Sequence, residues 1–182
     1  MDLVNHARLS TWLGAHIDTG PVLSAELLTG GNSNATYRLA TESGRFVHRH
    51  PPRNAISKSA HNMEREYQVL KAFEDTPVLA PHPVAMCADP SIIGAPFLVM
   101  EAVDGVPLPD RLPDGYGDDA VAILGEQMVD GLGDLHGVNW EAVGLAGFGQ
   151  PHGFLDRQVA RWHGGIPSTK PTPCGTFHGS RK

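Results

Sequence analysis

The sequence predicts an α+β fold, in which an antiparallel sheet lies early in the chain and the longest helices follow it. Three segments with strand-like composition lie at residues 21–29, 34–41 and 45–50. The turns between them are short and contain glycine, which is typical of hairpins between antiparallel strands. Apolar residues three and four positions apart then mark helices further along the chain.

Helices are predicted on both sides of these strands. Residues 5–16 carry Leu9, Trp12 and Leu13 at helical spacing, which predicts a short helix that packs on the next part of the chain. After two prolines, the segment SAHNMEREYQVLKAF predicts a second helix with Ser59 as its N-cap. The apolar stripe of this second helix contains Met63, Tyr67, Leu70 and Phe73.

The later part of the chain predicts one more strand and one long helix. The short apolar run APFLVMEAV is bounded by turn residues, which is typical of a buried strand. Residues 118–136 predict a helix that needs a partner surface, because one side of it is apolar. From His163 onward the sequence is rich in glycine and proline without apolar periodicity, so we expect an unstructured tail. The apolar stripe of the long helix is Val121, Leu124, Met128, Leu132 and Leu135.

The composition is that of one globular domain, and it argues against two classes of partner, nucleic acids and membranes. Of the 182 residues, 41% are hydrophobic. The net charge of −6 argues against a nucleic-acid partner, because surfaces that bind nucleic acid are normally basic. No apolar run of about 18 residues occurs, which argues against a membrane partner. Two distant cysteines, Cys87 and Cys174, indicate neither a disulfide framework nor a zinc site, so we expect a cytoplasmic protein.

The turn between the first two strands is the first candidate binding feature. It contains Gly30, Gly31, Ser33 and Asn34, whose backbone N–H groups and small polar side chains could surround a phosphate. A generous hairpin turn would explain the same residues, and both interpretations stay open at this point. The turn matches neither the Walker loop nor the dinucleotide-binding glycine pattern.

The third strand carries the second feature. Strand alternation places Val47 and Arg49 on one face and His48 and His50 on the other. Arg49 therefore lies either in a site or at a solvated edge. Two imidazoles could bind a metal, but no third ligand accompanies them, so we interpret His48 and His50 as surface residues.

The helix after this strand carries the third feature. At about 100° per residue, Glu66 falls on the apolar stripe between Leu70 and Phe73. A buried carboxylate needs a cationic partner, and Arg49 is the natural candidate. A helix rotated enough to bring Glu66 to solvent is the alternative.

Six segments in this order resemble the N-terminal half of the aminoglycoside-phosphotransferase-like kinases. The nearest group is the one related to the kinase-like domains fused to acyl-CoA dehydrogenases. The resemblance runs from about residue 5 to Trp162. The segments are GGNSNATYRL, GRFVHRHPP, SAHNMEREYQVL, DPSIIGAPFLVMEAVDG, LGDLHGVNW and VGLAGFGQPHGFLDRQVARW.

This resemblance implies a protein-kinase-like architecture. Residues 1–103 would be the small lobe, with a five-stranded antiparallel sheet, a helix and the hinge. Residues 104–162 would begin the helical large lobe, and residues 163–182 would be a tail outside the family.

The resemblance also implies roles for particular residues. Gly30, Gly31, Ser33 and Asn34 would form the nucleotide-phosphate loop. Arg49, near Val47, stands where such kinases usually place a lysine that holds the phosphates, and Glu66 would pair with it. The hinge that holds adenine would consist of Met100, Glu101, Ala102 and Val103.

The implied activity is phosphorylation of a small-molecule hydroxyl with ATP and Mg²⁺. Such kinases need an H-G-D-x4-N loop and a later aspartate, and the sequence contains neither. We therefore assign no catalytic or metal-binding residue, and we expect a chain truncated before the catalytic loop and inactive by itself. A non-catalytic nucleotide-binding or interaction module, or a remnant, is the alternative.

Overall fold

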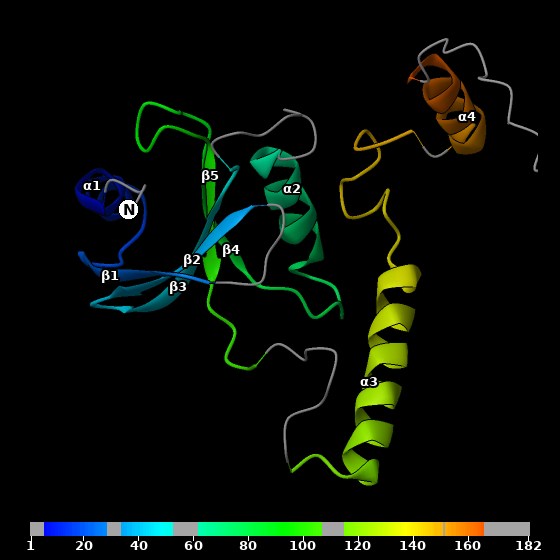
Figure 1. Ribbon diagram of the computed structural model, residues 1–182, viewed down its shortest axis with the longest axis horizontal. Helices are drawn as coiled ribbons and strands as arrows, with labels where there is room; N and C mark the ends of the chain where they lie inside the picture. Colours follow the sequence, from blue (N-terminus) through cyan, green and yellow to red (C-terminus); the bar gives the residue numbers. More distant parts are fainter. Residues whose placement is uncertain (1–5, 29–33, 53–61, 107–114, 151, 166–182) are drawn as a thin grey trace, which may run out of the picture. The chain divides into compact units, whose positions relative to one another are not determined.

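The computed structural model describes residues 6–28, 34–52, 62–106, 115–150 and 152–165. The chain divides into two compact units, Met1–Ala146 and Gly147–Lys182. In the first unit (Figure 1) the elements are α1 (His6–His16), β1 (Val22–Leu27), β2 (Ala35–Thr41), β3 (Gly44–His50), α2 (Met63–Phe73), β4 (Pro83–Cys87), β5 (Phe97–Glu101) and α3 (Asp118–Gly137). The second unit contains α4 (Phe154–Gly165).

The five strands form one antiparallel sheet in the order β1-β2-β3-β5-β4. The predicted α+β class and five-stranded antiparallel sheet are thereby confirmed. Strand β4 lies in the proline-broken stretch for which no individual strand was predicted. Both edge strands depart from regular pairing near their start, between Val22 and Ser24 in β1 and between Pro83 and Ala85 in β4.

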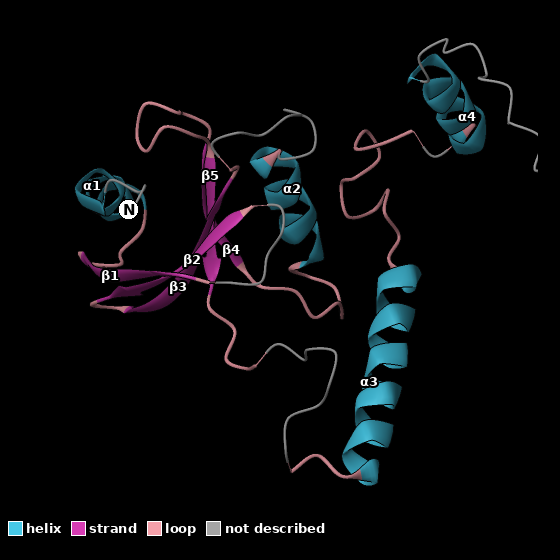
Figure 2. Cartoon of the chain, viewed as in Figure 1, coloured by secondary structure: helices cyan, strands magenta, loops and turns pink. Residues whose placement is uncertain are grey.

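One helix covers each face of the sheet (Figures 1 and 2). Helix α1 packs on the face formed by alternate residues of β2, β3 and β5. Helix α2 packs on the opposite face, beside Leu98 and Met100. The buried residues of the α1 face are Leu9, Leu13, Tyr37, Leu39, Cys87, Phe97 and Val99.

Strand β3 is therefore covered on both sides, and the interpretation of His48 and His50 as surface residues is wrong. Their side chains point to the α1 face, where His48 is fully buried and His50 is 8% exposed. The two rings lie 5.3 Å apart, and the ring of Tyr37 lies within 6 Å of both. The ring of Phe97 closes the other side of His48 at 5.2 Å. These histidines pack as aromatic residues of the core.

Helix α2 begins at Met63, and its N-cap is Asn62 rather than the predicted Ser59, which lies outside the described residues. The Asn62 side-chain oxygen accepts a hydrogen bond from the backbone N–H of Arg65 at 3.0 Å. This bond satisfies one of the N–H groups that a helix leaves free in its first turn. The cap therefore fixes where the helix starts.

The helices after the sheet bury much less. Helix α3 matches the predicted span to within one residue, and none of its side chains is buried. Helix α4 continues to Gly165, three residues beyond the Trp162 at which we expected regular structure to end. Among the described residues, no helix is long and apolar enough to cross a membrane.

Candidate functional site

An ion pair between β3 and α2 is the centre of the candidate site. Arg49 Nη1 contacts Glu66 Oε1, and the two side chains are 32% and 25% exposed. The predicted pairing is confirmed. It forms because Arg49 lies on the face of β3 that α2 covers, while Glu66 lies on the side of α2 that faces the sheet.

The other carboxylate oxygen of Glu66 faces the end of the glycine-rich turn. Asn34 Nδ2 lies 3.5 Å from Glu66 Oε2, a long and weak hydrogen bond. Glu66 thus contacts a cation with one oxygen and an amide with the other. The predicted phosphate-loop residues Gly30, Gly31 and Ser33 lie outside the described residues. Of the four residues predicted for this loop, the structure therefore describes Asn34.

The guanidinium of Arg49 has one N–H donor that makes no hydrogen bond to the described residues. This donor, Nε, is buried. A buried N–H without an acceptor costs free energy, typically about 1–3 kcal/mol. The Arg49 side chain as a whole is 32% exposed, and a guanidinium is well suited to hold phosphate oxygens.

The predicted hinge lies at the end of β5, on the same face of the sheet. Met100 is buried against Met63 of α2, and Val47 lies opposite Met100 in the neighbouring strand. Beyond the strand, Val103 is largely exposed. Val47 and Met100 thus belong to the apolar cluster between the sheet and α2, and β5 ends beside them at Glu101.

A second polar cluster lies at this end of the sheet, and the sequence did not indicate it. The backbone N–H of His82 donates to Glu101 Oε1 at 3.0 Å, and the N–H of Glu101 donates to the carbonyl of His82 at 2.9 Å. The imidazole of His82 lies 2.8 Å from Glu74, which follows the last residue of α2. The described part of the chain thus links α2 to the end of β5 through one histidine.

Metal binding finds no support in the described residues. No group of three or more histidine, cysteine, aspartate or glutamate side chains in this part of the chain could hold a metal ion.

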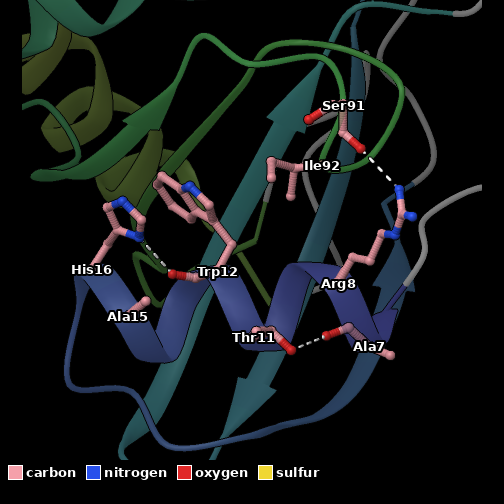
Figure 3. Close-up of a pocket in the computed structure, with 8 residues that line it drawn as sticks. All are labelled: Ala7, Arg8, Thr11, Trp12, Ala15, His16, Ser91 and Ile92. Carbon is pink, nitrogen blue, oxygen red and sulfur yellow. Dashed lines mark hydrogen bonds between the residues drawn. The ribbon is translucent and has the colours of Figure 1, made fainter.

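The cavity shown in Figure 3 lies on the opposite side of the sheet from Arg49. It has a volume of about 630 Å³ and lies between α1 and the segment before β5. Three of its polar side chains bond to nearby backbone carbonyls: Arg8 to Ser91, Thr11 to Ala7, and His16 to Trp12. The cavity is mainly apolar and open, and it does not adjoin the ion pair.

Residues 24–171 match the profile of the "Phosphotransferase enzyme family". The chain belongs to this family. The match begins within β1 and ends beyond α4, so it contains the ion pair, the end of β5 and both later helices. It also continues past Trp162, where we expected the resemblance to end.

The curated relatives are longer proteins of the acyl-CoA dehydrogenase family. The phosphotransferase-family chain is 34% identical over 152 residues to acyl-CoA dehydrogenase family member 10 of Mus musculus, covering 82% of this chain and 14% of that protein. It is 33% identical over 132 residues to family member 11 of Homo sapiens, covering 72% of this chain and 17% of that protein. The chain thus spans less than a fifth of these relatives.

Two solved structures share its fold. One, from Ralstonia eutropha, is provisionally described as an aminoglycoside phosphotransferase; it has a TM-score of 0.70 and 32% identity, with 88% of this chain and 46% of that chain covered. The other is a GDP complex of aminoglycoside 2'-phosphotransferase-IIIa, with a TM-score of 0.59 and 22% identity over 88% of this chain and 50% of that one. The chain spans about half of each structure.

Proposed function

We propose that the phosphotransferase-family chain forms the nucleotide-binding part of an ATP-dependent kinase that phosphorylates small-molecule hydroxyl groups. The observation that carries this proposal is the Arg49–Glu66 pair, in which the Arg49 side chain stays 32% exposed while Glu66 also contacts Asn34 of the glycine-rich turn. A guanidinium that is held in place and still partly exposed fits a site for phosphate.

In this proposal the ion pair holds the guanidinium ready for the nucleotide. Glu66 keeps Arg49 in place, so little side-chain entropy is lost when phosphate binds. Asn34, with Gly30, Gly31 and Ser33 of the same turn, contributes donors to the phosphates. Backbone groups of Glu101 and Val103 hold the base above Val47 and Met100. The binding of GDP by a solved structure of this fold supports the nucleotide class.

We propose residues 1–103 as the small lobe, 104–162 as the beginning of the large lobe, and 163–182 as a separate tail. The substrate hydroxyl would bind mainly to the large lobe, in a cytoplasmic protein. Because the 182 residues contain no H-G-D-x4-N loop, we expect this chain by itself to bind nucleotide without turnover.

Titration calorimetry with ATP and GTP tests nucleotide binding on the full chain. We expect Arg49→Ala to weaken ATP binding by about 10- to 100-fold, since a hydrogen bond to a charged group contributes about 1.5–3 kcal/mol. Arg49→Lys keeps the charge and should lose less. The matched control is Arg38→Ala in β2, which removes an exposed arginine paired with Glu26.

Three outcomes decide the proposal. ATP binding that depends on Arg49 and not on Arg38 supports it. No binding by the wild-type chain at millimolar nucleotide contradicts it and favours a remnant. ATP-dependent phosphorylation of a hydroxyl compound by the purified chain would overturn the expected lack of turnover.

A further inference from the structure

Three side chains connect the C-terminal end of α2 to the end of β5, and we call them the α2–hinge tether: Glu74, His82 and Glu101. His82 lies in the middle, just before β4. Its backbone exchanges hydrogen bonds with Glu101, one of them to the Glu101 carboxylate. Its imidazole Nδ1 faces Glu74 Oε1 at 2.8 Å. One residue therefore contacts both the helix end and the predicted hinge.

The contact between His82 and Glu74 is partly buried, on the Glu74 side. The Glu74 side chain is 17% exposed, while that of His82 is 57% exposed. Glu74 Oε1 is buried and receives no well-aligned hydrogen bond from the described residues, and His82 Nδ1 is the polar atom that lies beside it at 2.8 Å. Glu74 Oε2 contacts Lys71 at 2.5 Å, and this contact is the main reason that the pKa of Lys71 is raised. The carboxylate thus lies between the ammonium group of Lys71 and the imidazole of His82.

The same helix carries Glu66, the partner of Arg49. Glu66 and Glu74 are eight residues apart, which is about 12 Å along an α-helix. A hydrogen-bonded helix of this length is a stiff connection. The Arg49 end of the site and the hinge end are therefore joined by one rigid element that is fastened at both ends, through Glu66 to β3 and through Glu74 to His82.

We propose that His82 is a positioning residue. It fixes α2 to the hinge, so that the distance between the phosphate-binding end and the base-binding end of the nucleotide site stays constant. The inference rests on the proposed nucleotide function. Loss of the imidazole would remove the polar contact at the end of α2, so that only the apolar packing of α2 on the sheet would fix the spacing between its last turn and the end of β5. A ligand that spans both ends would then lose more affinity than a ligand that needs only one.

The experiment compares three ligands, ATP, adenosine and tripolyphosphate, on the wild-type chain and on variants of His82. We expect His82→Ala to weaken ATP binding by about fivefold, and to change adenosine and tripolyphosphate binding less than twofold. His82→Asn should restore ATP binding to within about twofold, because its amide nitrogen can lie where Nδ1 lies. His16→Ala, an exposed histidine of α1, is the matched control.

The ligand pattern separates positioning from a general loss of stability. A structural defect would weaken all three ligands alike, and this result would overturn the inference. Unchanged ATP binding in His82→Ala would overturn it as well. So would a His82→Asn variant as weak as His82→Ala, because the side-chain contact with Glu74 would then be irrelevant.

Hydrogen exchange separates failure of the tether from failure of the nucleotide function. A wild-type chain that binds no ATP contradicts the proposed function. The tether is then judged by the amide of Glu101 and the amides of the last turn of α2. Joint loss of their protection in His82→Ala supports the connection, and unchanged protection overturns it.

Discussion

The interior strand β5 and the helix α3 are both rich in apolar residues, yet they bury them to opposite extents. Phe97, Leu98 and Val99 are fully buried because one helix covers each face of the sheet. In α3, Met128 is 67% exposed and Leu132 is 51% exposed. The difference indicates that the folding free energy is concentrated in the sheet with α1 and α2. The apolar stripe of α3 contributes little to it.

The largest expected effect comes from the core of the sheet. Phe97→Ala removes a fully buried ring that contacts Trp12 and His48, and we expect a loss of about 3–5 kcal/mol in the free energy of unfolding. Because this loss approaches the stability of an ordinary domain, the variant should be largely unfolded or melt at much lower temperature. Urea unfolding followed by circular dichroism measures it.

The matched control lies in α3. Met128→Ala should change the free energy of unfolding by less than about 0.5 kcal/mol, since the methionine is mostly exposed and alanine favours helix. Equal losses in Phe97→Ala and Met128→Ala would contradict the comparison, because α3 would then share in the cooperative core.

A smaller effect is expected at a turn that supports the sheet. Gly20 has φ +63°, and a Cβ there would lie 2.9 Å from the Cβ of Glu42. We expect Gly20→Ala to lower the melting temperature, with a cost of about 1–2 kcal/mol for the left-handed backbone alone. Gly14→Ala in α1 meets no atom within 4 Å and should raise stability by up to about 1 kcal/mol. A neutral Gly20→Ala would show that this turn relaxes without strain.

The smallest effect depends on pH. The N–H and hydroxyl of Ser91 each bond to Asp89 at 2.8 Å and hold the pKa of Asp89 below its ordinary value. The folded state therefore favours the charged carboxylate. Its contribution to stability is complete above the unfolded pKa of about 3.9 and is lost as the pH falls through the folded pKa.

Asp89→Asn removes this titration. The difference in melting temperature between wild type and Asp89→Asn should therefore be largest near pH 6 and should shrink below pH 3 (about one unit under the ordinary aspartate pKa). A difference that stays constant with pH would contradict the assignment to Asp89.

The first three helices, the first three strands and β5 could be predicted, because each has a local sequence pattern of its own. Helix α3 follows from its apolar stripe, and the first three strands follow from alternation and turns. The Arg49–Glu66 pair was also accessible, since a glutamate on an apolar stripe requires a cation nearby. These are local rules applied to neighbouring segments.

The features that could not be predicted depend on which elements of the chain cover each face of the sheet and meet at its ends. Alternation separates His48 and His50 from Arg49, but it cannot tell that α1 buries the histidine face. Strand β4 was missed because prolines surround and begin it. The contact of His82 with Glu74 arises only when β4 pairs with β5 beside the end of α2, and no spacing in the sequence encodes that meeting.

The irregular pairing in β1 and β4 has a consequence for association between molecules. These are the two strands whose outer backbone groups could receive a strand from another chain. A break in register disturbs the repeating row of donors and acceptors that an incoming strand would need, and Pro83 offers no N–H at all. Growth of fibrils by strand addition is thereby disfavoured at both margins of the sheet.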